Sequence, residues 1–196
     1  MLLLFAANLP QEKSNNEIVR DSSLTFDEAI KGLKFPEQIR KQLKLIDVKY
    51  LGFDGKIHIG QLVVNKKVAH DLVTIFDELL KIKFPIHSVI PISQFDWDDE
   101  KSMLANNTSC FNYRVIKGTN RLSNHAFGLA IDINPFFNPY VKANSVEPEG
   151  AEYIPSRPGT ITKDSEVVKI FISKGWKWGG NWGKGKDYQH FEKILK

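Results

Sequence analysis

Two histidines and one aspartate are the residues of this 196-residue chain best suited to bind a metal ion. His125 and Asp132 stand seven positions apart on either side of a glycine, and His190 lies near the C-terminus. Two imidazoles and one carboxylate suit zinc and leave a fourth position for water. Cys110 is the single cysteine, so any metal site must use histidines and carboxylates. The chain therefore has a residue set for metal-assisted hydrolysis.

Hydrolysis by an activated water also needs a group that accepts the proton of that water. Asp187 stands three residues before His190, in a segment with the pattern of a strand. We expect Asp187 to be this base. A histidine and an aspartate seven residues apart occur often by chance, so the prediction depends on the wider pattern in which they stand.

The residues around His125 and Asp132 predict how these two side chains come close together. Residues 129–134 alternate as in a strand, and a period of two sends Ala130, Asp132 and Asn134 to one face. Gly128 allows a sharp turn before this strand. His125 can then point back toward the face that carries Asp132.

The segment 123–132 also matches the pattern Ser-x-His-x-x-Gly-x-Ala-x-Asp. This pattern is the signature of the zinc D,D-carboxypeptidase and L-alanyl-D-glutamate endopeptidase family (peptidase family M15), and the chain looks most similar to its endolysin-like subgroup. Further motifs extend the resemblance over most of the chain: Phe53-Asp-Gly, Gly60-Gln-Leu-Val-Val-Asn, Asn112-Tyr-Arg114, Ile133-Asn-Pro, Asn138-Pro-Tyr, Trp178-Gly-Gly-Asn-Trp and Asp187-Tyr-Gln-His-Phe-Glu.

The resemblance implies a role for each residue of the site. It implies zinc on His125, Asp132 and His190, and Asp187 as general acid and base. It further implies that Arg114 polarises the scissile carbonyl and stabilises the oxyanion, which is the electrostatic contribution that usually dominates such barriers. It also implies that Ser123 contacts the substrate or supports a metal ligand. Apart from the resemblance, the ring of Trp182 is a candidate to line the substrate groove, with the core as the alternative.

Other residues have plainer interpretations. We expect Cys110, Trp176 and Trp178 in the core. The other histidines are expected to be surface or hydrogen-bonded residues without metal contact: His58, His70 and His87. Arg121 competes with Arg114 for the oxyanion, but its place just before Ser123 favours a loop surface. Asn181 replaces an aspartate usual in the family, a loss that we expect to be tolerated.

Hydrophobic periodicity predicts an α+β fold in a single domain, with a small antiparallel or mixed sheet flanked by helices. The resemblance implies that this fold is of the hedgehog/D,D-peptidase type. Helices are expected at 26–30, 37–46, 68–80 with Asn65 as a possible cap, and 164–174, and an acidic helix or loop at 96–106. Strands are expected at 48–53, 57–64, 86–92, 110–115 and 129–134, with a long irregular stretch up to Gly159. We expect no second hydrophobic core.

Composition and charge bound the function. Hydrophobic residues make up 42% and charged residues 26%, which is typical of a soluble globular domain. The net charge of +4 is scattered, so nucleic-acid binding is not indicated. The apolar run at residues 2–7 resembles the end of a secretory signal but is too short to span a membrane. We expect residues 1–24 to be an N-terminal extension or partial signal segment and residues 25–196 to be the peptidase domain.

These observations predict a zinc metallopeptidase that cuts peptidoglycan stem peptides outside the cytoplasm as a monomer, without stable membrane insertion. Either the D-Ala-D-Ala bond or the L-Ala-D-Glu bond is the target. A different class of function is a non-catalytic, zinc-stabilised wall-binding module, and a third is a general protease for L-peptides. The acid at Asp187 favours an enzyme.

Overall fold

The computed structural model describes residues 18–143 and 145–195. The apolar run at residues 2–7, interpreted above as the end of a signal, lies outside the described residues. The described chain has an α+β fold in one compact domain, as predicted, built from small sheets and short helices. None of the described helices has the length and apolar character needed to cross a membrane.

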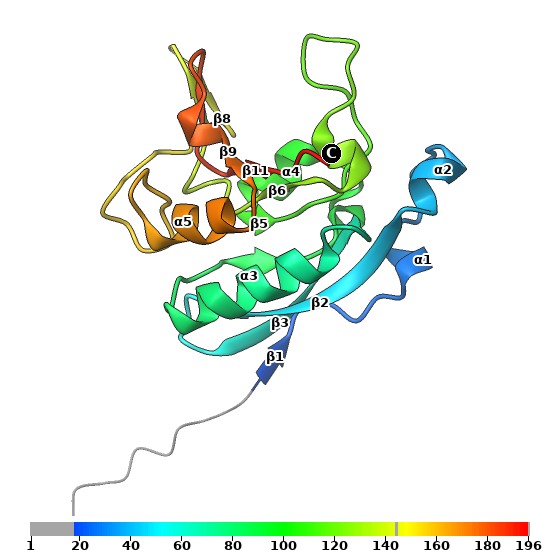
Figure 1. Cartoon of the computed structure of the whole chain (residues 1–196), viewed down its shortest axis with the longest axis horizontal. Coiled ribbons are helices and arrows are strands. Elements are labelled where there is room, and N and C mark those ends of the chain that lie inside the picture. Colours follow the sequence, from blue (N-terminus) through cyan, green and yellow to red (C-terminus); the bar gives the residue numbers. More distant parts are fainter. Residues whose placement is uncertain (1–17, 144, 196) are drawn as a thin grey trace, which may run out of the picture.

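The helices are short, apart from one in the core. They are α1 (Phe26–Ala29), α2 (Glu37–Arg40), α3 (Ala69–Lys81), α4 (Asp99–Leu104) and α5 (Glu166–Ser173), with 3-10 turns η1 (Ile92–Phe95), η2 (Asn124–Phe127) and η3 (Gly179–Asn181). Helix α3 lies along the long β-hairpin of residues 43–65, and α5 lies against α3 on the side away from the hairpin (Figure 1).

The described strands form four small sheets. Their orders are β1-β3-β2, β10-β7-β8, β6-β11-β9 and β4-β5. The strands are β1 (Ile18–Arg20), β2 (Leu43–Leu51), β3 (Ile57–Asn65), β4 (Ser88–Val89), β5 (Asn107–Thr108), β6 (Ala130–Asp132), β7 (Tyr140–Lys142), β8 (Ser145–Glu147), β9 (Lys177–Trp178), β10 (Lys186–Asp187) and β11 (His190–Glu192).

The predicted hairpin is present but longer than expected. Strands β2 and β3 pair over their full lengths, from Leu43 opposite Asn65 to Leu51 opposite Ile57. The helix predicted at 37–46 is therefore wrong beyond residue 40. Ile39, Leu43 and Ile46 satisfy a helical spacing, but pairing with β3 determines the structure from Leu43 onward.

Buried side chains form two clusters, one on each face of this hairpin. Leu62 and Val64 belong to the larger cluster, which α3 and α5 cover, whereas Val63 belongs to a smaller cluster beneath α1 and α2. The expectation of no second core was wrong because alternate residues of β3 are apolar on both faces. Trp176 and Trp178 are buried in the larger cluster, as predicted.

Four further expectations need correction. The strand predicted at 86–92 is reduced to β4, and the strand predicted at 110–115 is irregular, because its backbone bonds go to separate partners. The irregular stretch up to Gly159 contains the β7–β8 hairpin. Asn65 does not cap α3, since Val68 is the N-cap and Asn65 Oδ1 accepts a hydrogen bond from Lys67 N.

Strand β1 joins the N-terminal part of the described chain to the sheet. It pairs in parallel with β3, although residues 18–20 belong to the segment expected to be an N-terminal extension. Just beyond β1, Asp21 Oδ1 lies 2.9 Å from His58 Nδ1, and Asp54 Oδ1 lies 3.1 Å from His58 Nε2. The described N-terminus is thus attached to the hairpin by a histidine between two carboxylates. The division at residue 24 stays a prediction.

This cluster predicts a pH-dependent stability. Burial lowers the pKa of His58, but Asp21 and Asp54 outweigh burial, and the net shift is upward. Protonation therefore stabilises the fold, fully below the unfolded value of about 6.5 and less as the pH rises through the folded pKa. We expect the difference in Tm between the natural chain and His58→Gln to shrink between pH 6 and pH 9. His70→Gln, at an exposed position, should show no such trend.

Candidate metal and catalytic centre

His125, the first of the three candidate metal ligands, is held by the short turn η2. Ser123 is the N-cap of this turn, and its Oγ accepts a hydrogen bond from His125 N at 3.3 Å. Gly128 ends the turn with a φ of 65°, in the left-handed region. Its carbonyl accepts a hydrogen bond from Asn65 N at 2.9 Å. The signature glycine therefore attaches the turn that carries His125 to strand β3.

Gly128 is also required by close packing. A Cβ at this position would lie 2.6 Å from Asn65 N and 2.9 Å from Leu43 Cδ2. We expect Gly128→Ala to lower the free energy of unfolding by about 2 to 5 kcal/mol, since a left-handed residue costs about 1 to 2 kcal/mol and an overpacked contact about 1 to 3 kcal/mol. Gly118→Ala is the matched control: its φ of 75° is similar, but no described atom lies within 4 Å of the added Cβ. Equal losses in urea unfolding would contradict this explanation.

The other two ligands are brought together by strand pairing. Strands β6 and β11 are antiparallel, and their register places His190 opposite Asp132. Directly opposite residues of such a pair have their side chains on the same face. All three ligand side chains are buried, and their ligand atoms lie within 4.8 Å of one another. The structure therefore brings the predicted cluster together from η2, β6 and the distant strand β11.

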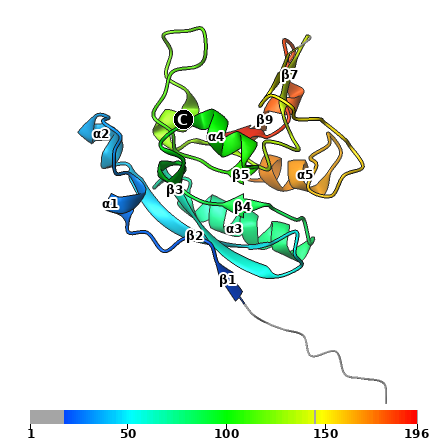
Figure 2. The same cartoon turned by 180° about the vertical axis from the view of Figure 1, so that it is seen from behind.

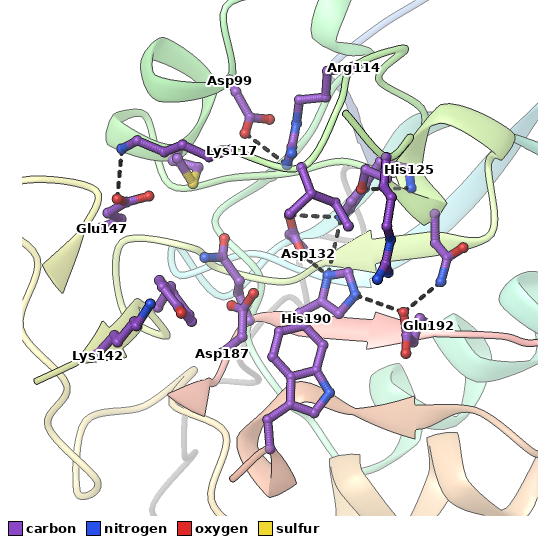
Figure 3. A pocket seen from close by; sticks show the side chains of 18 of the residues that line it. Asp99, Arg114, Lys117, His125, Asp132, Lys142, Glu147, Asp187, His190 and Glu192 are labelled. Atoms are coloured by element: carbon purple, nitrogen blue, oxygen red, sulfur yellow. Dashed lines mark hydrogen bonds and ion pairs between the residues drawn. The ribbon is translucent and has the colours of Figure 1, made fainter. Parts of the chain in front are cut away.

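Both imidazoles are oriented by acceptors outside the cluster. His125 Nδ1 lies 2.6 Å from the Cys110 carbonyl oxygen, which can accept only from a protonated nitrogen. Glu192 Oε2 lies 3.6 Å from His190 Nε2, on the outer side of that ring. The other two nitrogens, His125 Nε2 and His190 Nδ1, face each other at 3.2 Å (Figure 3). Once a cation displaces the proton of His190, these two nitrogens and the Asp132 carboxylate can bind it together, as in metal sites with outer acceptors.

The spacing of these atoms fits a small tetrahedral cation. Asp132 Oδ2 lies 3.2 Å from His125 Nε2, and Asp132 Oδ1 lies 3.0 Å from His190 Nδ1. Ligands about 2.0 to 2.1 Å from a tetrahedral zinc ion are separated from one another by about 3.3 Å. The three residues present therefore fit a zinc ion. Sequence reasoning did not single out Glu192, although its place two residues after His190 on one strand puts both on the same face.

Electrostatics couple the three ligands. Burial raises the pKa of Asp132, but His125 and His190 outweigh burial and hold it well below its ordinary range. Burial lowers the pKa of His190, whereas Asp132 and Glu192 raise it, to about 10. A cation at this point must displace a proton from His190, so metal affinity increases with pH.

Asp187 lies beside the ligands in the same cavity. Asp187 is on β10. A Cβ added at Gly179, in η3, would lie 2.8 Å from the Cβ of Asp187 and 3.2 Å from the Cβ of His190. The absence of a side chain at Gly179 therefore lets η3 pack closely against both residues. Asp187 Oδ1 is buried and has no hydrogen-bond partner among the described residues. Burial raises the pKa of Asp187 to about 7. A carboxylate of this kind is suited to exchange protons near neutral pH.

The cavity has a volume of about 610 Å³ and contains every residue predicted for the site. Ser123 and Trp182 line it, and the ring centroid of Trp182 lies 5.2 Å from that of His190. Arg114 also lines it and pairs with Asp99, a residue that sequence reasoning missed. Arg121 lies at the exposed rim. Asn181 is exposed and is not one of the residues whose oxygen atoms orient the imidazoles of His125 and His190.

Two projecting segments form walls of this cavity. Residues 115–122 and the β7–β8 hairpin extend from the same end of the molecule (Figure 1 and Figure 2). Both contribute lining residues, and Lys117 Nζ lies 2.7 Å from Glu147 Oε1, joining one segment to the other. The cavity is therefore a cleft between two arms, with the metal-ligand cluster among its lining residues.

Residues 117–193 match the model of a protein family described as D-alanyl-D-alanine carboxypeptidase. The match confirms the predicted resemblance to peptidase family M15 and supports a peptidase. The matched segment contains His125, Asp132, Asp187 and His190, whereas Arg114 precedes it. No solved structure matches the chain.

Proposed function

We propose that this chain is a zinc-dependent peptidase that hydrolyses peptidoglycan stem peptides outside the cytoplasm. One observation carries the proposal: the buried cluster of His125, Asp132 and His190 shares one cleft with Asp187, whose buried Oδ1 has no hydrogen-bond partner among the described residues. The family match supports a peptide with D-alanine residues as substrate. The cleft, which reaches the surface between two arms, has room for an extended peptide.

Each residue has a role in the proposed reaction. His125, Asp132 and His190 would hold the zinc ion, which would supply Lewis acidity toward water and the scissile carbonyl. Asp187 accepts the proton of the attacking water and passes it to the leaving nitrogen as the C–O bond forms and the C–N bond breaks, so amide and water become a carboxylate and an ammonium group. Arg114 donates hydrogen bonds to the oxyanion. Ser123 and Trp182 contact the peptide from the cleft wall.

The test is digestion of purified muropeptides by zinc-loaded protein, with the products identified by mass spectrometry with and without a chelator. We expect cleavage that the chelator abolishes and that added zinc restores. The product masses distinguish loss of terminal D-alanine from cleavage between L-alanine and D-glutamate. Intact muropeptides together with binding to sacculi would instead favour a wall-binding module. Cleavage of casein at a comparable rate would favour a general protease.

A further inference from the structure

We infer that Asp99 is a positioning residue for Arg114, holding its guanidinium at the cleft wall in the orientation that the reaction requires. The inference rests on the proposed function, because the role of Arg114 does. Asp99 Oδ2 lies 2.9 Å from Arg114 Nη2, and both side chains line the cleft (Figure 3). Each is 32% exposed, so water screens the pair and its main effect is on orientation.

Asp99 is itself held by the core. Its Oδ1 accepts a hydrogen bond of 3.2 Å from Asn112 Nδ2, and Asn112 is buried. The backbone N–H of Asn112 donates to the carbonyl oxygen of His125 at 3.2 Å. A continuous chain of polar contacts therefore runs from the residue that carries a metal ligand, through Asn112 and Asp99, to Arg114. These contacts fix the position of the guanidinium relative to the metal-ligand cluster.

The ion pair with Asp99 uses only part of the hydrogen-bond donors of Arg114. Arginine has five N–H donors in a rigid fork. Nη2 faces Asp99, while Nε is buried and has no partner among residues 18–143 and 145–195. Because Arg114 lines the cleft and is partly exposed, the guanidinium N–H groups that are not directed at Asp99 are available to a group that enters the cleft.

Loss of Asp99 should affect the rate more than substrate binding. Without its carboxylate, the long Arg114 side chain regains rotamer freedom, and its donors meet the oxyanion for a smaller fraction of the time. The oxyanion forms only in the transition state, so kcat falls while KM changes little. We expect Asp99→Ala to lower kcat by about 10- to 100-fold, with a metal content near that of the natural chain.

Glu100→Gln is the matched control. Glu100 is the next residue of α4, is exposed and has no ion pair within the described part of the chain. This variant removes the same charge at the same helix terminus without touching Arg114. It should keep kcat within about two-fold of the natural value, because an exposed charge contributes little. Asp99→Asn, which keeps an acceptor for Asn112, should lose less activity than Asp99→Ala.

A double-mutant cycle tests whether Asp99 acts through Arg114. If it does, the variant with both Asp99→Ala and Arg114→Ala is no slower than Arg114→Ala alone. Additive losses, or natural kcat in Asp99→Ala, would overturn the inference while the proposed function stands. If the natural zinc-loaded chain cuts no muropeptide, the proposed function itself fails.

A spectroscopic measurement is independent of activity. In ¹⁵N NMR spectra of the whole chain, the Nε–H signal of Arg114, assigned by its absence in Arg114→Lys, should be resolved in the natural chain and in Glu100→Gln. It should shift and broaden in Asp99→Ala, because the side chain then averages over rotamers. An unchanged Arg114 signal in Asp99→Ala would show that Asp99 does not hold the guanidinium.

Discussion

Replacing Asp187 with alanine is expected to lower kcat for muropeptide hydrolysis by about 10²- to 10⁴-fold, the usual contribution of a general acid and base. Its buried Oδ1 lacks a partner among the described residues and lies in the cleft with the metal ligands. Removing it takes away the proton acceptor without removing a ligand. The variant should therefore keep its metal while losing turnover, as steady-state kinetics and elemental analysis of the same sample will show.

Asp187→Asn separates charge from shape. It keeps the volume of the side chain but cannot accept the proton, so its kcat should be close to that of Asp187→Ala. Glu149→Ala serves as the control, since Glu149 is an exposed acid that makes no ion pair in the described chain. Natural activity in Asp187→Asn would contradict the assignment of the base.

His125→Ala is expected to lose both the metal and the activity. It removes a buried ligand, and two remaining ligands hold zinc far more weakly than three. An ion that binds the folded chain but not the unfolded chain raises the free energy of unfolding, by about 2.7 kcal/mol at a concentration of 100 times Kd. Zinc should therefore raise the Tm of the natural chain but not that of His125→Ala.

His70→Ala is the control for this experiment, because His70 is exposed on α3 away from the cluster. It should bind zinc as the natural chain does. Equal loss of zinc in His125→Ala and Asp187→Ala would contradict the separate roles of ligand and base.

The cluster of His125, Asp132 and His190 could be predicted because two of its three residues lie within one short motif. The glycine turn and the strand that follows it place His125 beside Asp132, and a strand containing His190 needs only to pair with β6. The α+β class followed from periodicity in the same way. Burial then explains why these particular polar residues interact so strongly.

Features that depend on long-range contacts were not predictable. Residues 43–46 fit both a helix and a strand, and only their pairing with β3 determines which forms. The β7–β8 hairpin lies in a stretch rich in glycine, proline and asparagine, where periodicity gives no signal. Asp99 was missed because an acid near a helix N-terminus is usually a favourable surface charge. Its pairing with Arg114 depends on the tertiary fold.

The central claim is that His125, Asp132 and His190 converge on one cation. Crystals of the zinc-loaded chain, measured on both sides of the zinc absorption edge, test this most directly. We expect one anomalous peak with His125 Nε2, His190 Nδ1 and an Asp132 oxygen about 2.0 to 2.2 Å away, and Asp187 beside it. A peak elsewhere, or His190 turned away from the other two ligands, would contradict the claim.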